Sequence, residues 1–166
     1  MERKELATAA ATADEIRWVG TDLEPLGERE RSLLAPLAAT IEYEPGVLIL
    51  HEGRPTPFLG ILAAGRIALR LQVPARGPYV VVTLEPGDIF GWSALVPPHR
   101  ATSDAVALTP VHALALDAER LRDVLRDDHE VAAQLLPIVL RCVSERLTTS
   151  WHQLLDLFGM RGVGPW

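Results

Sequence analysis

The chain has 166 residues, about the length of one domain; 48% of them are hydrophobic and 23% are charged. This composition is ordinary for a globular protein and excludes a disordered or fibrous chain. Sixteen basic against 22 acidic side chains give a formal net charge of −6. Because a field of that sign repels polyanions, we expect neither nucleic acid nor an anionic membrane as a partner.

The cysteine content and the first twenty residues further limit the class of protein to which the chain can belong. The single Cys142 allows no internal disulfide and cannot by itself hold an iron–sulfur cluster or a structural zinc, so we expect a buried apolar thiol. The first twenty residues mix acidic side chains with alanines and lack a continuous apolar core. They therefore fit neither a signal peptide nor a membrane span, and the sequence predicts a cytoplasmic protein.

Residues 1–38 are predicted to be a helical segment, interrupted by turn-forming residues between Gly20 and Pro25. After a charged run at residues 28–31, leucines recur at helical spacing, which indicates a short amphipathic helix. These leucines are Leu33, Leu34 and Leu37.

Residues 39–116 have the pattern of β-strands. Pro-Gly and related turn sequences recur about every ten residues, which is typical of an antiparallel sandwich or barrel. Apolar and polar residues alternate from Ile67 to Val73 and again from Val80 to Leu84. The alternation predicts two half-buried strands joined as a hairpin, each with one inward face.

Residues 117–158 are predicted to be helical and are followed by a tail, residues 159–166. Asp117 can cap a first helix, and Asp127 or Asp128 can cap a second, longer one that Pro137 should bend. An apolar stripe runs along the longer helix at spacings of three and four residues, as in a core-facing helix or a dimer seam. Its members are Leu136, Leu140, Val143, Leu147, Trp151, Leu154 and Phe158.

One segment carries candidate binding chemistry. A turn, a short strand and a Gly-led run of small residues lie between Leu84 and Leu95, and Arg100 follows five residues later. Backbone N–H groups of such a run can face an anion, and a guanidinium can hold two phosphate oxygens. Ser93 and Thr102 can add hydroxyl donors. From residue types alone, the pattern also fits a tight turn beside a solvated arginine.

Four ordered blocks of this region resemble the cyclic nucleotide-binding domain family, the sensor module of catabolite activator proteins and of cyclic nucleotide-gated channels. The blocks are a Pro-Gly turn and strand ending in Glu-Gly, a hairpin with Ala-Gly at its turn, Pro-Gly-Asp-Ile-Phe-Gly, and Arg-Ala-Thr, at residues 44–53, 59–67, 86–91 and 100–102. The resemblance extends from Leu23 to Leu154. It implies a mainly β jelly roll, a double-stranded β-helix with N-terminal helices and a long C-terminal helix.

The same resemblance implies a phosphate-binding cassette at Gly91, Ser93, Ala94, Arg100, Ala101 and Thr102, with Arg100 as the phosphate ligand. The chain departs from the family at Trp92, where ligand-binding members carry a glutamate that accepts a hydrogen bond from the ribose 2′-hydroxyl. An indole has one donor and no carboxylate. We therefore expect an altered or degenerate cassette, with a cyclic nucleotide or another phosphate as the candidate ligand, no catalytic residue and no bound metal.

The long helix has two roles in the family. It reads the base, for which Thr149 and Ser150 are the candidates here, and it forms the dimer interface. The resemblance thus favours a homodimer over an intramolecular role for the apolar stripe, and an unidentified effector protein as the receiver of the signal. The interface residues would be Leu140, Val143, Leu147 and Trp151.

Three alternatives remain open. The chain can be a functional cyclic nucleotide receptor, or the sensor fragment of a transcription regulator. Only residues 159–166 follow the long helix, too few for a helix-turn-helix domain, so direct DNA binding is expected only of a longer protein. A cupin-like metalloenzyme is the alternative from another class, but its metal site needs clustered histidines, and those of this chain are scattered.

Overall fold

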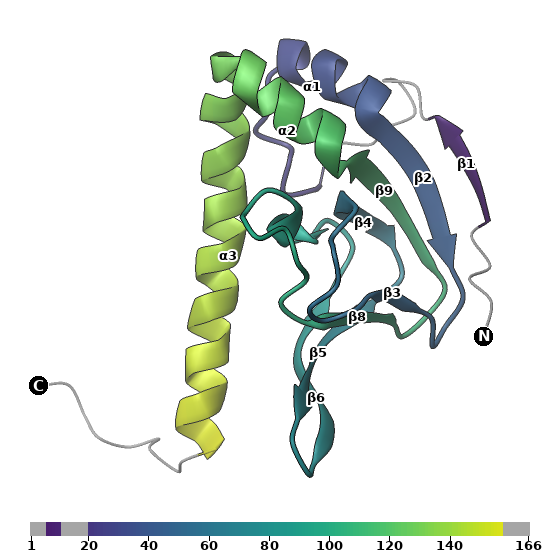
Figure 1. The fold of residues 1–166 in the computed structure, drawn as a ribbon, viewed down its shortest axis with the longest axis vertical. Helices are drawn as coiled ribbons and strands as arrows, with labels where there is room; N and C mark the ends of the chain where they lie inside the picture. Colours follow the sequence, from purple (N-terminus) through teal and green to yellow (C-terminus); the bar gives the residue numbers. More distant parts are fainter. Residues whose placement is uncertain (1–5, 11–19, 158–166) are drawn as a thin grey trace, which may run out of the picture.

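The structure of the chain, a computed structural model, describes residues 6–10 and 20–157. In this part, nine strands form two antiparallel sheets, of strand order β1-β2-β9-β4-β7 and β3-β8-β5-β6. Figure 1 shows the roll that they make, with α3 along one side. The predicted jelly roll is confirmed. The strands are β1 Leu6–Ala10, β2 Ala38–Tyr43, β3 Leu48–Leu50, β4 Phe58–Ala64, β5 Ile67–Val73, β6 Gly77–Leu84, β7 Ile89–Phe90, β8 Asp104–Ala107 and β9 Val111–Asp117.

Capping carboxylates set the starts of the C-terminal helices. The Asp117 carboxylate accepts the N–H of Arg120 at 2.9 Å, and the Asp128 carboxylate accepts the N–H groups of Glu130 and Val131. Asp117 is thus confirmed as a cap, and Asp128 caps the longer helix rather than its neighbour. The helices are α1 Glu28–Leu34, α2 Ala118–Asp127 and α3 His129–Leu157, with 3₁₀ turns η1 Ala35–Leu37 and η2 Trp92–Ala94; α3 continues through Pro137.

Residues 1–38 were predicted to be helical, and strand β1 shows that part of this prediction is wrong. Leu6–Ala10 pairs antiparallel with β2, Ala10 opposite Ala39. Alanine favours a helix locally, but pairing with the edge of a sheet supplies the backbone hydrogen bonds that five residues cannot form as a helix. The helix predicted after the charged run is present as α1 and η1. Residues 1–5 and 11–19 lie outside the described part of the chain.

Two apolar clusters make the core. One lies where the helices cover the five-stranded sheet and includes Leu34, Leu116, Leu121 and Leu135. The other fills the roll around Phe90. The roll is closely packed there, since a Cβ on Gly60 would lie 2.3 Å from the Phe90 ring. The short strand β7 lies between the two clusters, because Ile89 belongs to the first and Phe90 to the second.

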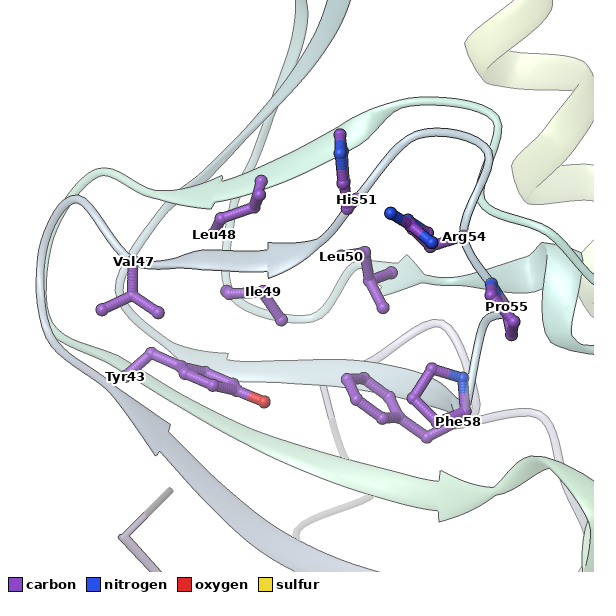
Figure 2. Close-up of a pocket in the computed structure, with 10 residues that line it drawn as sticks. Tyr43, Val47, Leu48, Ile49, Leu50, His51, Arg54, Pro55 and Phe58 are labelled. Carbon is purple, nitrogen blue, oxygen red and sulfur yellow. The ribbon is translucent and has the colours of Figure 1, made fainter. Parts of the chain in front are cut away.

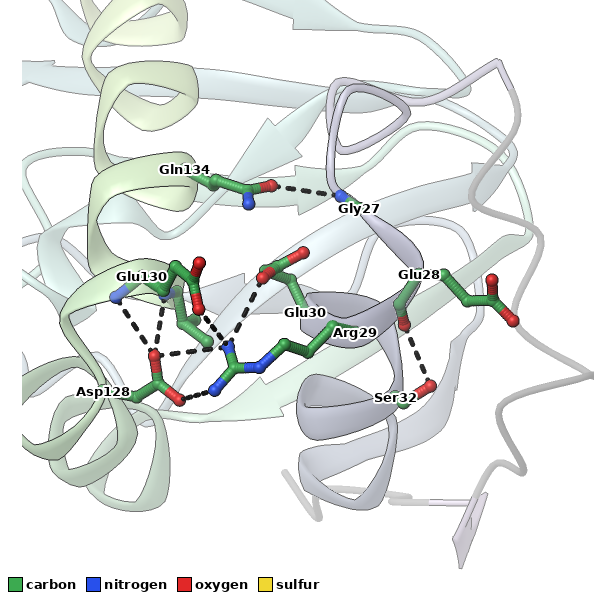
Figure 3. A network of polar contacts seen from close by, with 9 residues as sticks. Gly27, Glu28, Arg29, Glu30, Ser32, Asp128, Glu130 and Gln134 are labelled. Atoms are coloured by element: carbon green, nitrogen blue, oxygen red, sulfur yellow. Dashed lines mark hydrogen bonds and ion pairs between the residues drawn. The ribbon is translucent and has the colours of Figure 1, made fainter.

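Polar contacts hold α1 against the junction of α2 and α3 (Figure 3). The Arg29 guanidinium donates to both oxygens of Asp128, at 2.6 and 3.4 Å, and lies 3.4 Å from the Glu130 carboxylate. The hydrogen bonds from Arg29 lower the pKa of Asp128. Gln134 accepts the N–H of Gly27 at 3.1 Å. Asp128 therefore caps the start of α3 and also binds Arg29 of α1.

The predicted hairpin is β5–β6, paired from Ile67 opposite Leu84 to Val73 opposite Gly77. Its inward face extends over only part of its length: Ile67 and Leu84 are buried, whereas Leu71 and Val80 are exposed. Figure 1 shows why, because the far end of the hairpin projects beyond the roll.

Candidate functional site

The cassette begins where β7 ends. Gly91 adopts a left-handed backbone with φ 70°, and a Cβ there would lie 2.8 Å from the carbonyl oxygen of Phe58. Glycine is therefore required at this position. The chain then forms the 3₁₀ turn η2, in which Ala94 donates its N–H to the Gly91 carbonyl at 2.9 Å. The N–H groups at the start of such a turn have no partner within it.

Small buried residues fix this turn against the preceding loop. Ser93 and Ala94 are buried, and the Ser93 hydroxyl lies 3.0 Å from that of Thr56. Ala101 exchanges backbone hydrogen bonds with that same loop, donating to Arg54 and accepting from Gly53, each at 2.8 Å. The structure thus brings both halves of the predicted cassette together.

Arg100 lies at the surface of the cassette. Its side chain is exposed, and Nη1 donates to the Gly53 carbonyl at 2.8 Å. The guanidinium is therefore held to the loop before β4, and its role as a phosphate ligand stays a prediction.

A pocket of about 20 Å³ lies inside the cassette. A buried water needs about 10–15 Å³, so the pocket as it stands admits little more than one water-sized group. Trp92 is half-buried, forms one wall and also packs against the helix-side cluster. The lining residues are Leu50, Leu69, Gly91, Trp92, Ser93, Ala101, Thr102, Ser103, Ala105 and Arg146.

Arg146, on α3, is a site residue that the sequence analysis missed. It lines the pocket, and its Nη1 atom is buried without a hydrogen-bond partner among the described residues. Burial lowers the pKa of its guanidinium from the ordinary value. The sequence does contain a signal, because Arg146 continues the buried face of α3 formed by Leu135, Val139 and Cys142, at spacings of four, three and four. A charged residue at a position that the helical spacing predicts to be buried indicates a candidate binding residue.

Thr149 and Ser150, the predicted base-contacting residues, bond within their own helix. The Thr149 hydroxyl donates to the Glu145 carbonyl at 3.0 Å and the Ser150 hydroxyl to the Arg146 carbonyl at 2.9 Å. Both donors are therefore in use, as is common for such residues inside helices. Neither residue is among the ten that line the pocket.

The apolar stripe on α3 faces away from the roll. Leu140 is 68% exposed and Trp151 57%, and Leu136 and Leu147 are exposed as well. Val143 is half-buried, whereas Val139 and Cys142 on the other face are buried. The stripe is therefore not intramolecular core at these positions. The side chain of Leu154 and all of Phe158 lie outside what the structure describes.

Asp104 fixes the far end of the cassette. It is buried at the start of β8, where its carboxylate accepts from His51 and Gln72 at 2.8 Å and from the N–H of Glu52 at 2.9 Å. Burial opposes ionisation, but these hydrogen bonds outweigh it and hold the pKa of Asp104 below its usual value of 3.8. One carboxylate thus joins β8, β5 and the loop after β3.

We expect Asp104→Asn to lower the free energy of unfolding at pH 7 by about 1.5–3 kcal/mol, the usual contribution of a hydrogen bond to a charged group. Because the folded pKa of Asp104 is depressed, its contribution is complete above about pH 4 and is lost as pH falls through the folded pKa. Urea denaturation at pH 7 and at pH 3 should therefore show the difference shrinking in acid. The exposed Asp123→Asn is the control, and a difference unchanged with pH would contradict this account.

A larger cavity of about 630 Å³ opens between β3, the end of β2 and the start of β4. Figure 2 shows the rings of Tyr43 and Phe58 facing it, with His51 and Arg54 along its rim. His51 is engaged with Asp104. The walls are mainly apolar, with polar side chains at Tyr43, His51 and Arg54.

Cys142 is buried, as predicted, and burial raises the pKa of its thiol to about 12. The thiol donates to Asp22 at 3.1 Å, which ties α3 to the loop before α1. The described residues contain no group of three or more His, Cys, Asp or Glu side chains that could hold a metal ion. None of the described helices is long and apolar enough to cross a membrane.

Residues 40–128 match the sequence family of the cyclic nucleotide-binding domain, which is more than half of the chain. The chain belongs to this family, and it is a cyclic nucleotide-binding regulatory module by fold and sequence.

Particular relatives extend the comparison. The chain is 28% identical, over 70% of its length, to a CRP-like cAMP-activated global transcriptional regulator of Mycobacterium tuberculosis, and it spans half of that protein. It is 35% identical, over 54% of its length, to the acetyltransferase Pat of Mycolicibacterium smegmatis, of which it covers 24%. A cyclic nucleotide-binding domain from Methylobacillus flagellatus has a similar fold, with a TM-score of 0.72 and 18% identity; the match covers 84% of this chain and 76% of that one.

Proposed function

We propose that the chain is a non-catalytic, homodimeric sensor module whose cassette has lost ribose recognition, so that cyclic AMP and cyclic GMP bind weakly. The observation that carries this proposal is Trp92, at the position implied for the ribose-binding glutamate. It brings no acceptor, and its ring is a wall of a pocket of about 20 Å³. A cyclic nucleotide would need both the missing carboxylate and more space.

The homodimer is supported by the exposed stripe on α3. A row of large apolar side chains on one helix face is a frequent mark of a protein interface. The side chains of Leu140, Leu147 and Trp151 are all about half exposed or more. A second copy, docked along this helix, would remove that apolar surface from water.

A ligand-activated receptor is the second candidate, because the Mycobacterium tuberculosis relative is described as cAMP-activated. The acetyltransferase relative gives no comparable reason to propose catalysis, since the similarity covers only 24% of it. The two candidates differ in their affinity for cyclic nucleotides.

Thermal and calorimetric titration of the full chain with cyclic AMP and cyclic GMP decides between them. A ligand at a hundred times its dissociation constant adds about 2.7 kcal/mol of stability. We expect a much smaller gain at a concentration of about 100 µM, where a receptor of micromolar affinity would show that full increase. A gain of that size would overturn the degenerate cassette and establish the receptor.

A further inference from the structure

The α3 side of the cassette pocket presents the guanidinium of Arg146. Among the ten described residues that line it, Arg146 is the only charged one, and no carboxylate is present. Its Nη1 atom is buried and has no partner in the described part of the chain. A buried charged donor left unsatisfied is costly, so native structures supply such groups with a partner, whether protein, water or ligand.

The lining of the pocket supplies Arg146 with no counter-charge. Burial has the largest effect on the pKa of its guanidinium and lowers it, whereas the carboxylates of Asp88, Asp22 and Glu145, outside that lining, raise it through space. The side chains of Trp92 and Thr102 on the wall of the pocket are neutral, and the hydroxyl of Ser93 is hydrogen-bonded to Thr56. A guanidinium binds a phosphate or carboxylate through charge-assisted hydrogen bonds, which are roughly twice as strong as neutral ones. The desolvation that lowers the pKa of Arg146 also strengthens its attraction to an anion within the pocket.

We infer that Arg146 makes this pocket an oxyanion site. Its guanidinium, on α3, binds a phosphate or carboxylate group beside Trp92. The inference rests on the proposed function, because it names what the altered cassette takes in place of a ribose. Trp92 stands where the family resemblance implies a carboxylate, so the charged group that lines this pocket is the guanidinium of Arg146 on α3. Because the pocket of about 20 Å³ admits little more than one water-sized group, a phosphate or carboxylate requires Trp92 or α3 to move, and compact anions need the smallest movement.

Titrations of the full chain with inorganic phosphate and with acetate, each against chloride at equal ionic strength, test the inference. We expect phosphate, acetate or both to raise the melting temperature of the parent protein. Arg146→Gln should weaken that binding tenfold or more in calorimetry, because it removes the charge and keeps a side chain of comparable reach. Arg126→Gln is the matched control, since Arg126 is an exposed α2 residue that pairs with Asp123; it should bind as the parent does.

A second measurement needs no ligand. Arg146 is half-buried and its Nη1 atom is buried without a partner among the described residues, so Arg146→Gln in chloride should have a melting temperature equal to or above that of the parent. A large decrease would instead mark Arg146 as a structural residue and would overturn the inference. Anion binding that is absent in the parent, or equal in Arg146→Gln, would overturn it too.

These failures are distinguishable from failure of the proposed function. Strong cyclic AMP binding by the parent refutes the degenerate cassette, whatever phosphate does. Conversely, phosphate binding that survives Arg146→Gln but is lost in Arg100→Gln refutes the role of Arg146 and leaves weak cyclic nucleotide binding intact.

Discussion

Trp92→Glu should bind cyclic AMP about 10- to 150-fold more tightly than the parent protein. The range corresponds to the 1.5–3 kcal/mol that a hydrogen bond to a charged group contributes. The substitution restores the acceptor that the family resemblance implies and removes the indole that walls the pocket. Calorimetry with cyclic AMP measures the change directly.

Trp92→Leu separates the two effects of this substitution. Leucine opens nearly the same space as glutamate but has no hydrogen-bond acceptor, so it should recover only the part of the affinity that depends on volume. Equal affinity in both variants would show that bulk alone blocks the ribose. No gain in either would show that the cassette departs from a nucleotide site at more than this position, as the attachment of Arg100 to the Gly53 carbonyl allows.

Leu147→Asp should convert the proposed homodimer into a monomer. Leu147 lies midway along the exposed stripe of α3, between Val143 and Trp151. Burying an unpaired carboxylate at the centre of an interface is costly, and the few hot-spot positions near an interface centre contribute about 2 kcal/mol or more, or roughly a 30-fold rise in the dissociation constant. Sedimentation velocity over a range of concentrations measures the shift.

Leu108→Asp is the matched control for this experiment. Leu108 is 45% exposed and Leu147 is 48% exposed, so the two changes add a carboxylate at equally accessible leucines. Leu108 lies between β8 and β9, away from α3 in sequence. A monomeric parent protein, or dissociation by both variants, would contradict the helix interface. Circular dichroism of both variants tests whether they keep their fold.

The sequence predicted the features that depend on local chemistry. Turns at Gly46 and Gly65 have positive φ, and Asp117 and Asp128 cap their helices, because each needs only neighbouring residues. Strand β1 was missed because its partner β2 is some thirty residues further on and outweighs the helix preference of alanine. Tertiary context decided that segment.

The site was predicted unevenly for the same reason. Gly91 and the buried Ser93, Ala94 and Ala101 follow one another in short motifs, so their placement in the cassette could be anticipated. Arg146 could not be assigned to the pocket without knowing that α3 lies beside the cassette. The orientation of Arg100 depends on the carbonyl of Gly53, 47 residues earlier, which no motif records.

Arg146 and Leu147 are consecutive residues of α3, yet one lines the pocket and the other belongs to the exposed stripe. Successive side chains of a helix are about 100° apart around its axis, and a rigid helix turns as a unit. A rotation of α3 that repositions the guanidinium therefore carries the apolar stripe through the same angle. A ligand that prefers one orientation of the helix changes the dissociation constant of the dimer. By thermodynamic reciprocity, dimerisation changes the affinity for that ligand by the same factor.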